Sequence, residues 1–170
     1  MKRIIVAIVS IVFCFGLAAC GSDDSDDSSN AEKEKVYGIG DTWTVNGQWN
    51  LTINSVTPTD ERNEFADTNP AEVVIIDYTY ENLGYEDSNE IMNGLYLDLE
   101  MGQIVDSAGQ MCQSYPASSV TKYAQETPVG ATCNAQAAIG LTQAGGPIEI
   151  TMNEYDGDNN EQTATFKLEF

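Results

Sequence analysis

Short runs of alternating apolar and polar residues characterise the chain from residue 36 onward. Trp49, Leu51 and Ile53 alternate with polar neighbours, which is the period-two pattern of a strand with one buried face. Residues 73–80 form a nearly unbroken run of β-branched and aromatic side chains, which predicts a central strand covered on both faces. Because no stretch of ten or more residues has a convincing helical period, the pattern predicts an all-β domain.

Further strand candidates alternate with turn-forming residues. The candidates are residues 95–99, 103–105, 111–115, 131–141, 148–152 and 164–170. Turn signals occur at 82–84, 106–109, 128–130 and 156–159, and the polar stretch 60–70 is predicted to be an exposed loop. About eight short strands joined by uneven loops predict a β-sandwich in preference to a barrel.

The first twenty residues have a different composition. Two basic residues precede an almost wholly apolar run, 4–17, and two alanines then precede Cys20. This order is typical of an export signal, and the apolar run is shorter than the roughly 20 residues of a membrane-spanning helix. Residues 17–20 resemble the lipobox of bacterial lipoproteins, which implies removal of residues 1–19 and acylation of the Cys20 sulfur. An ordinary secretory signal, or an uncleaved anchor with an incidental Cys20, remains the alternative.

Two further regions follow the predicted signal peptide. Residues 20–35 are mainly Ser, Asp, Asn, Glu and Lys, a composition that cannot bury enough apolar area to fold, so we predict a flexible acidic linker. Residues 36–170 have the length of one ordinary domain with a single core. The predicted organisation is therefore a signal peptide (1–19), a lipidated Cys20 with its linker (20–35) and a β-sandwich domain (36–170).

The charge balance narrows the possible partners. The chain has 27 acidic and 7 basic residues, for a net charge of −20. Such a surface repels phosphate groups, which excludes nucleic acid as a partner. The predicted partners are the membrane, through the lipid on Cys20, and an unidentified envelope protein or ligand. The predicted location is the extracellular face of the cell membrane.

Two cysteines remain in the predicted domain, Cys112 and Cys133. An even pair in an exported protein predicts a disulfide between them. The alternative is a redox-active or nucleophilic thiol, but the pair lacks CxxC spacing and the chain contains no histidine to activate a thiolate.

The absence of histidine also limits catalysis, because it excludes Ser-His-Asp triads, Cys-His pairs and histidine-based zinc sites in their usual forms. Ser119 and Lys122 match the S-x-x-K pattern of penicillin-recognising serine enzymes, but the companion motifs are missing. A pair of carboxylates can hydrolyse glycosides, so an envelope hydrolase remains an alternative. The main prediction is a protein that is not an enzyme.

One acidic turn suggests cation binding. Its four carboxylates are Glu154, Asp156, Asp158 and Glu161, and their spacing partly resembles acidic calcium loops. A weak calcium site here is one interpretation, and a solvated hairpin tip is the other. No other cofactor is predicted.

Several tyrosines are candidates for a binding surface. Exposed aromatic side chains can form the patch of a binding module. The candidates are Tyr85, Tyr96, Tyr115, Tyr123 and Tyr155. The other interpretation is that these are isolated surface or half-buried tyrosines.

Four segments together carry a family resemblance: 40–53, 72–82, 95–109 and 127–130. They resemble a group of Gram-positive lipoproteins that carry an immunoglobulin-like domain of unknown function. The resemblance implies a two-sheet, immunoglobulin-like β-sandwich exposed at the cell surface, and it supplies no catalytic or ligand-binding residues. The predicted function is a membrane-anchored extracellular lipoprotein with a non-enzymatic binding or structural module.

Overall fold

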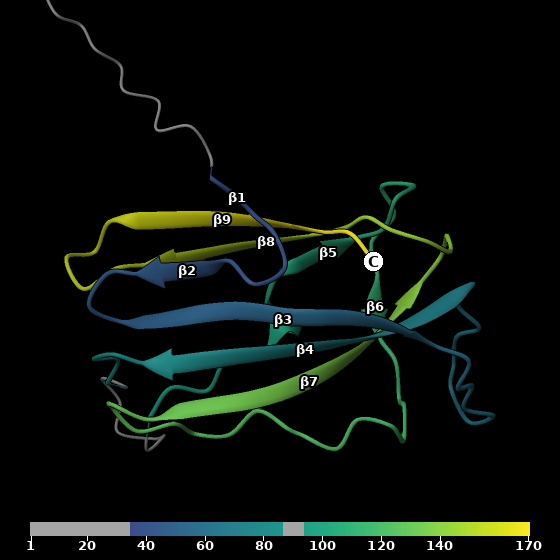
Figure 1. Ribbon diagram of the computed structural model, residues 1–170, viewed down its shortest axis with the longest axis horizontal. Coiled ribbons are helices and arrows are strands. Elements are labelled where there is room, and N and C mark those ends of the chain that lie inside the picture. The colour runs from purple at the N-terminus through teal and green to yellow at the C-terminus, as the bar shows by residue number, and fades with distance from the viewer. Residues whose placement is uncertain (1–34, 87–93) are drawn as a thin grey trace, which may run out of the picture. The chain divides into compact units, whose positions relative to one another are not determined.

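A computed structural model describes residues 35–86 and 94–170. The strands are β1 (Val36–Tyr37), β2 (Thr42–Val45), β3 (Trp49–Thr59), β4 (Glu72–Asn82), β5 (Gln103–Val105), β6 (Gln113–Ser114), β7 (Thr132–Leu141), β8 (Ile148–Tyr155) and β9 (Glu161–Leu168), with one 3-10 turn, η1 (Leu99–Met101). They form two sheets in the orders β1-β9-β8-β5 and β2-β3-β4-β7-β6 (Figure 1). This confirms the predicted all-β, immunoglobulin-like β-sandwich. Within the two described ranges, no helix is long and apolar enough to cross a membrane.

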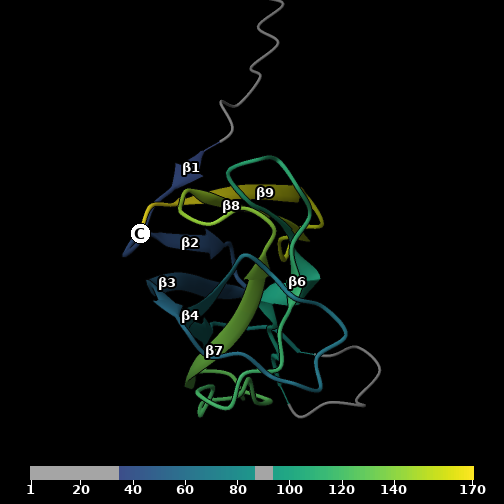
Figure 2. The same cartoon turned by 90° about the vertical axis from the view of Figure 1, so that its right-hand side faces the viewer.

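The two sheets enclose one main core. Figure 2 shows β8 and β9 on one side of this core and β3, β4 and β7 on the other. Trp43 and Trp49 meet edge to face with ring centroids 4.9 Å apart, and Phe166 lies 6.3 Å from Trp43. The two tryptophans therefore have the packing role that their positions in alternating strands predict.

The predicted central strand is confirmed as β4, which pairs with β3 on one side and β7 on the other. Its inward side chains, among them Tyr78 and Tyr80, are buried in the core. Its outward side chains include Asp77 and Thr79, which are partly exposed. The outer face is therefore covered only in part, which differs from the predicted cover on both faces.

One end of that outer face carries a second, smaller apolar cluster. Val73 and Ala138 are buried there beneath Tyr115, with Ala117 and Val120 packed against them. These last three side chains come from the segment that follows β6. The loop 60–70 contributes to the same cover through Ala66, so this predicted loop packs onto the sheet.

Residues 95–99 do not form the predicted strand. Leu95 makes an isolated bridge with Thr127, and η1 begins at Leu99. Asp98 caps η1 by accepting a hydrogen bond from the backbone N–H of Glu100 at 3.0 Å. The leucines of this segment are nevertheless buried, because alternation encodes which side of a segment meets the core and does not specify a strand partner.

The predicted lipidation site, Cys20, and the predicted signal peptide lie outside the residues that the structure describes, as does nearly all of the predicted linker. Acylation of Cys20 therefore stays a prediction.

Candidate functional site

The edge of β7 is covered by a long irregular segment in place of a full strand. The short strand β6 pairs with β7 only at residues 113–114. The chain then follows the β7 edge as a strap, residues 115–128. The N–H of Tyr115 donates to the carbonyl of Ala138, and the N–H of Gln136 donates to the carbonyl of Lys122. Between these two contacts the chain leaves the edge as a ledge, residues 116–121.

The ledge is held by polar contacts to the loop that precedes β4. The Glu61 carboxylate accepts hydrogen bonds from the backbone N–H groups of Ser118 and Ser119. Side-chain hydrogen bonds from the same two serines, together with these backbone bonds, lower the pKa of Glu61 to about 2. The side-chain amide of Asn63 donates to the carbonyl of Pro116 in the ledge at 2.9 Å, and the backbone N–H of Asn63 donates to the hydroxyl of the adjacent Tyr115 at 2.7 Å. Two side chains of the same loop, Glu61 and Asn63, therefore hold the ledge in place.

A second segment, residues 95–100, faces the strap. Its buried leucines alternate with Tyr96, Asp98 and Glu100, so these three side chains point away from the core. The backbone of Leu95 exchanges two hydrogen bonds with that of Thr127, of 2.8 and 2.9 Å. This bridge ties the segment to the far end of the strap.

A pocket of about 490 Å³ lies between the two segments. Its aromatic and polar lining includes Tyr78, Tyr96, Asp98, Glu100, Tyr123 and Gln136. The Tyr78 hydroxyl donates to the carbonyl of Leu97 at 3.2 Å. Burial raises the pKa of Tyr78, so this hydroxyl stays protonated and keeps that bond. The Tyr123 hydroxyl donates to the carbonyl of Val120 at 3.1 Å, which links its ring to the ledge.

Tyr123 separates this pocket from a neighbouring one. The second pocket, of about 500 Å³, is lined by the later part of the strap and the first residues of β7. Tyr123 lines both pockets and is 66% exposed. The exposed ring is therefore the common wall of a groove that follows the β7 edge.

The positive charge nearest in sequence to Tyr123 is paired with Asp77, whose same carboxylate oxygen accepts a hydrogen bond from the pocket residue Gln136 at 3.3 Å. The Lys122 ammonium is 2.9 Å from the Asp77 carboxylate, on the outer face of the sheet. Partial burial acts to raise the pKa of Asp77, but hydrogen bonds from Asn54, Asn134 and Lys122, together with the charge of Lys122, lower it overall. Within the described ranges this is the only salt bridge.

The S-x-x-K match does not form a catalytic pair. Ser119 lies in the ledge, where its backbone is bonded to Glu61, and the segment is not helical. Lys122 is paired with Asp77. The chemistry of that motif needs a helix that places the lysine one turn after the serine, so this segment supports no such activity.

The acidic turn is the tip of the β8–β9 hairpin, as the hairpin interpretation predicts, and its four carboxylates are not arranged as the alternative calcium site requires. In the β8–β9 register Glu154 faces Gln162 and Tyr155 faces Glu161, so Glu154 and Glu161 point to opposite faces of the hairpin. The Asp156 carboxylate accepts hydrogen bonds from backbone N–H groups of its own turn. Asp158, the fourth predicted ligand, is exposed at that tip. Among the described residues, no three acidic, cysteine or histidine side chains are grouped to hold a metal ion.

The predicted disulfide is also wrong, because the strand register separates its cysteines. Cys133 pairs with Tyr80 near the start of β7, whereas Cys112 precedes Gln113, which pairs with Gly140 near the end of β7. At about 3.3 Å per residue the two are on the order of 20 Å apart, and a disulfide needs Cα atoms about 6 Å apart. Both thiols are free. Burial and the charge of Asp106 raise the pKa of Cys112 to about 11.

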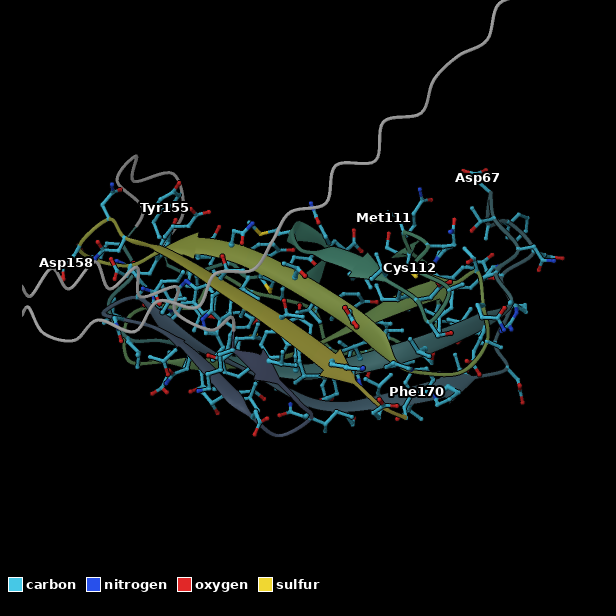
Figure 3. All side chains as sticks on the ribbon, turned by 90° about the horizontal axis from the view of Figure 1, so that it is seen from above. Asp67, Met111, Cys112, Tyr155, Asp158 and Phe170 are labelled. Atoms are coloured by element: carbon cyan, nitrogen blue, oxygen red, sulfur yellow. The ribbon has the colours of Figure 1, made fainter. Side chains whose placement is uncertain are left out.

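Three of the five candidate tyrosines meet at the first pocket. Tyr96, Tyr115 and Tyr123 line it, whereas Tyr85 packs against the main core. Tyr155 lies near Asp158 toward one end of the sandwich, whereas Cys112 lies toward the other end (Figure 3). Because Tyr115 is buried, Tyr96 and Tyr123 are the two candidate tyrosines exposed at the pocket, and a binding patch there stays a prediction.

The other lining residues were missed by the sequence analysis. Asp98 and Glu100 escaped attention because the alternation in 95–100 was interpreted only for its leucines. The same alternation also predicts that the side chains of Asp98 and Glu100 point away from the core. Gln136 carries no comparable signal, since its role depends on where the strap runs.

Two solved structures share this fold. The chain is similar to the YjhA protein of Bacillus subtilis, with 15% identity and a TM-score of 0.52, over 76% of this chain and 98% of that one. It is also similar to MPT63, a secreted protein of Mycobacterium tuberculosis, with 10% identity and a TM-score of 0.56, over 81% of this chain and 99% of that one. At these identities the similarity shows the β-sandwich fold alone. No protein-family model matches the sequence, and comparison with curated proteins found no match.

Proposed function

We propose that this protein is an exported lipoprotein, anchored to the outer face of the cell membrane through Cys20, whose β-sandwich is a non-enzymatic binding module. The binding site is the pocket between the strap (115–128) and the 95–100 segment. The observation that carries the proposal is the preformed pocket itself, with exposed tyrosines at its rim.

The export part of the proposal is supported by the sequence. The basic, apolar and small-residue order of residues 1–19 is that of a signal peptide, and Cys20 stands where a lipobox has its acylated cysteine. MPT63, which has the same fold, is a secreted protein, and this is consistent with a function of the present protein outside the cytoplasm. Two acyl chains on Cys20 give stable membrane attachment, whereas one chain alone is marginal.

The binding part is supported by the size and construction of the pocket. A volume of about 490 Å³ lies within the range of small-molecule sites. Its ledge is fixed by Glu61 and Asn63 before any ligand arrives, which lowers the ordering cost of binding. Tyrosine rings at the rim offer large contact areas at low entropic cost.

The anchoring is tested by mass spectrometry of the N-terminal peptide from the membrane fraction. We expect a chain that begins at diacylglyceryl-modified Cys20, and we expect Cys20→Ala to release the protein from the membrane. A different first residue, or an unmodified Cys20 thiol, would contradict the anchoring while leaving the binding module untouched.

The binding module is tested with two matched tyrosine variants of the full-length protein in detergent. Tyr123→Ala removes a pocket ring that is 66% exposed, and Tyr155→Ala removes a ring outside the pocket that is 58% exposed. Each protein is incubated with an envelope extract, and retained small molecules and fragments are identified by mass spectrometry. We expect ligands retained by the wild type and Tyr155→Ala to be lost from Tyr123→Ala. Equal retention by Tyr123→Ala would overturn the assignment of the pocket.

A further inference from the structure

We propose that the pocket recognises an alkylammonium group, the protonated primary amine or quaternary amine of a small ligand. This inference rests on the proposed binding function and specifies the chemistry of its ligand. It follows from three properties of the described lining residues: exposed aromatic rings, carboxylates that form no ion pair with a described residue, and the absence of lysine and arginine among them.

The aromatic rings supply the first property. Tyr96 is 42% exposed and Tyr123 is 66% exposed, and the two lie on the two segments that border the pocket. Their hydrophobic ring faces attract a cation through the ring quadrupole, an interaction that is strongest when the cation is partly removed from water. A pocket lined by rings from opposite segments offers that partial removal.

The carboxylates supply the second property, and they differ from other acidic side chains of the protein. Glu61, Asp77, Asp106 and Asp156 each accept several hydrogen bonds from neighbouring protein groups. Asp98 accepts one, from the backbone of η1, and no described residue forms an ion pair or hydrogen bond with the Glu100 carboxylate. The pocket therefore presents acceptor capacity that the described part of the protein does not use.

The overall charge favours a cation over an anion. Among the described residues no lysine or arginine lines the pocket, and the nearby Lys122 ammonium is paired with Asp77, so a phosphate or carboxylate ligand would lack an unpaired basic partner there. The net charge of −20 repels anions and concentrates cations near the surface. A metal ion is disfavoured, because among described residues no group of three potential ligands is in place. An organic cation uses both the rings and the carboxylates.

Cation recognition is tested with two pairs of probes that match in shape and differ in charge. Choline is compared with 3,3-dimethyl-1-butanol, and butylamine with butanol. Each is titrated into the full-length protein in a non-ionic detergent, and binding is followed by NMR through the tyrosine ring resonances. We expect at least one cation to bind about tenfold more tightly than its neutral counterpart, with shifts at Tyr96 and Tyr123 and none at Tyr155. Equal binding within both pairs would overturn the proposal.

Two glutamate variants give the matched control. Glu100→Gln and Glu161→Gln each remove one negative charge from an exposed side chain, the first at the pocket and the second at the β8–β9 hairpin tip. We expect Glu100→Gln to weaken cation binding about threefold to fivefold and Glu161→Gln to leave it unchanged. Equal effects would attribute binding to net charge and overturn the local assignment.

The two proposals fail in different ways. Neutral probes that bind the pocket as well as the cations would refute the alkylammonium specificity and leave the binding module standing. If none of the four probes binds, the specificity is refuted, and the envelope capture experiment decides the binding function by itself.

Discussion

Two turns of this protein have the same local structure and different roles. One begins at Asp106 and the other at Asp156. In each, the N–H of the aspartate donates to the carbonyl four residues later at 3.0 Å, and its carboxylate accepts backbone hydrogen bonds from the residues two and four positions later. The residue three positions later has positive φ in both turns: 71° at Gly109 and 64° at Asn159.

The difference lies in the second carboxylate oxygen. In Asp106 it accepts the backbone N–H and hydroxyl of Thr142 and the N–H of Gln143, at 2.5 to 3.0 Å, beyond the end of β7. In Asp156 the second oxygen accepts side-chain amides of Asn160 and Gln162, within the same hairpin. Asp106 therefore joins two parts of the sandwich and is only 4% exposed, whereas Asp156 stabilises its own turn.

This comparison explains why an acidic turn is weak support for a metal site. An aspartate at the first position of such a turn uses its carboxylate to satisfy the backbone. The same oxygens are then less available to a cation. A carboxylate that remains available is one without hydrogen-bond or ion-pair partners among the described residues, such as Glu100. The number of acidic residues in a stretch of sequence does not identify it.

The largest expected difference between the turns is in stability. Asp106→Ala removes the acceptor of several part-buried hydrogen bonds that join two parts of the sandwich, so we expect it to lower the free energy of unfolding by about 3 to 5 kcal/mol. Asp156→Ala removes exposed hydrogen bonds that water can replace, and we expect a much smaller loss of stability. Urea unfolding of the two variants measures both values. Similar losses would show that the link from Asp106 to Thr142 adds nothing beyond the local turn.

The second difference is in acid sensitivity. Burial acts to raise the pKa of Asp106, but hydrogen bonds from Thr142, Gln110, Gln143 and Ala108 outweigh it and lower the pKa to about 2. Because this lies below the ordinary value of 3.8, the ionised carboxylate stabilises the fold above about pH 4, and this stabilisation is lost as pH falls toward 2.

The variant Asp106→Asn separates the pH dependence that is due to Asp106 from that of other acidic groups such as Glu61. Between pH 5 and 2 the wild type should lose about 2 kcal/mol more stability than Asp106→Asn, which cannot ionise at this position. Urea unfolding at a series of pH values measures the difference. Parallel pH curves for the two proteins would refute the role of the Asp106 charge.

The smallest expected effect concerns the residue with positive φ. Gly109 has open space around its Cα, so a side chain there meets only backbone strain. The asparagine at the equivalent position, 159, shows that this turn accepts that residue type. We expect Gly109→Ala to cost about 1 kcal/mol and Gly109→Asn less than about 0.5 kcal/mol. Thermal melting compares them, and equal costs would show that the turns are not equivalent.

The architecture was predictable because side-chain alternation reports burial directly. The strands around Trp49 and Leu51, and the central position of β4, follow from it. It misled at 95–99, where three leucines are buried without a strand. Alternation places side chains on the two sides of a segment, but hydrogen-bond partners are decided by chain segments far away in sequence.

The site was less predictable for the same reason. Tyr96 and Tyr123 were recognisable as candidates, but their meeting depends on a strap that follows β7 without pairing regularly with it. The register of β6 on β7 likewise separates Cys112 from Cys133. Such distant pairings are not encoded by composition or local spacing.

The central claim is that the pocket beside β7 binds an alkylammonium ligand. It is tested most directly by a crystal structure of the protein with saturating choline and, separately, butylamine. We expect ligand density between Tyr96, Tyr123 and Glu100 in at least one of the two crystals. Ligand density only at other sites, or an unoccupied pocket in both crystals, would contradict the claim.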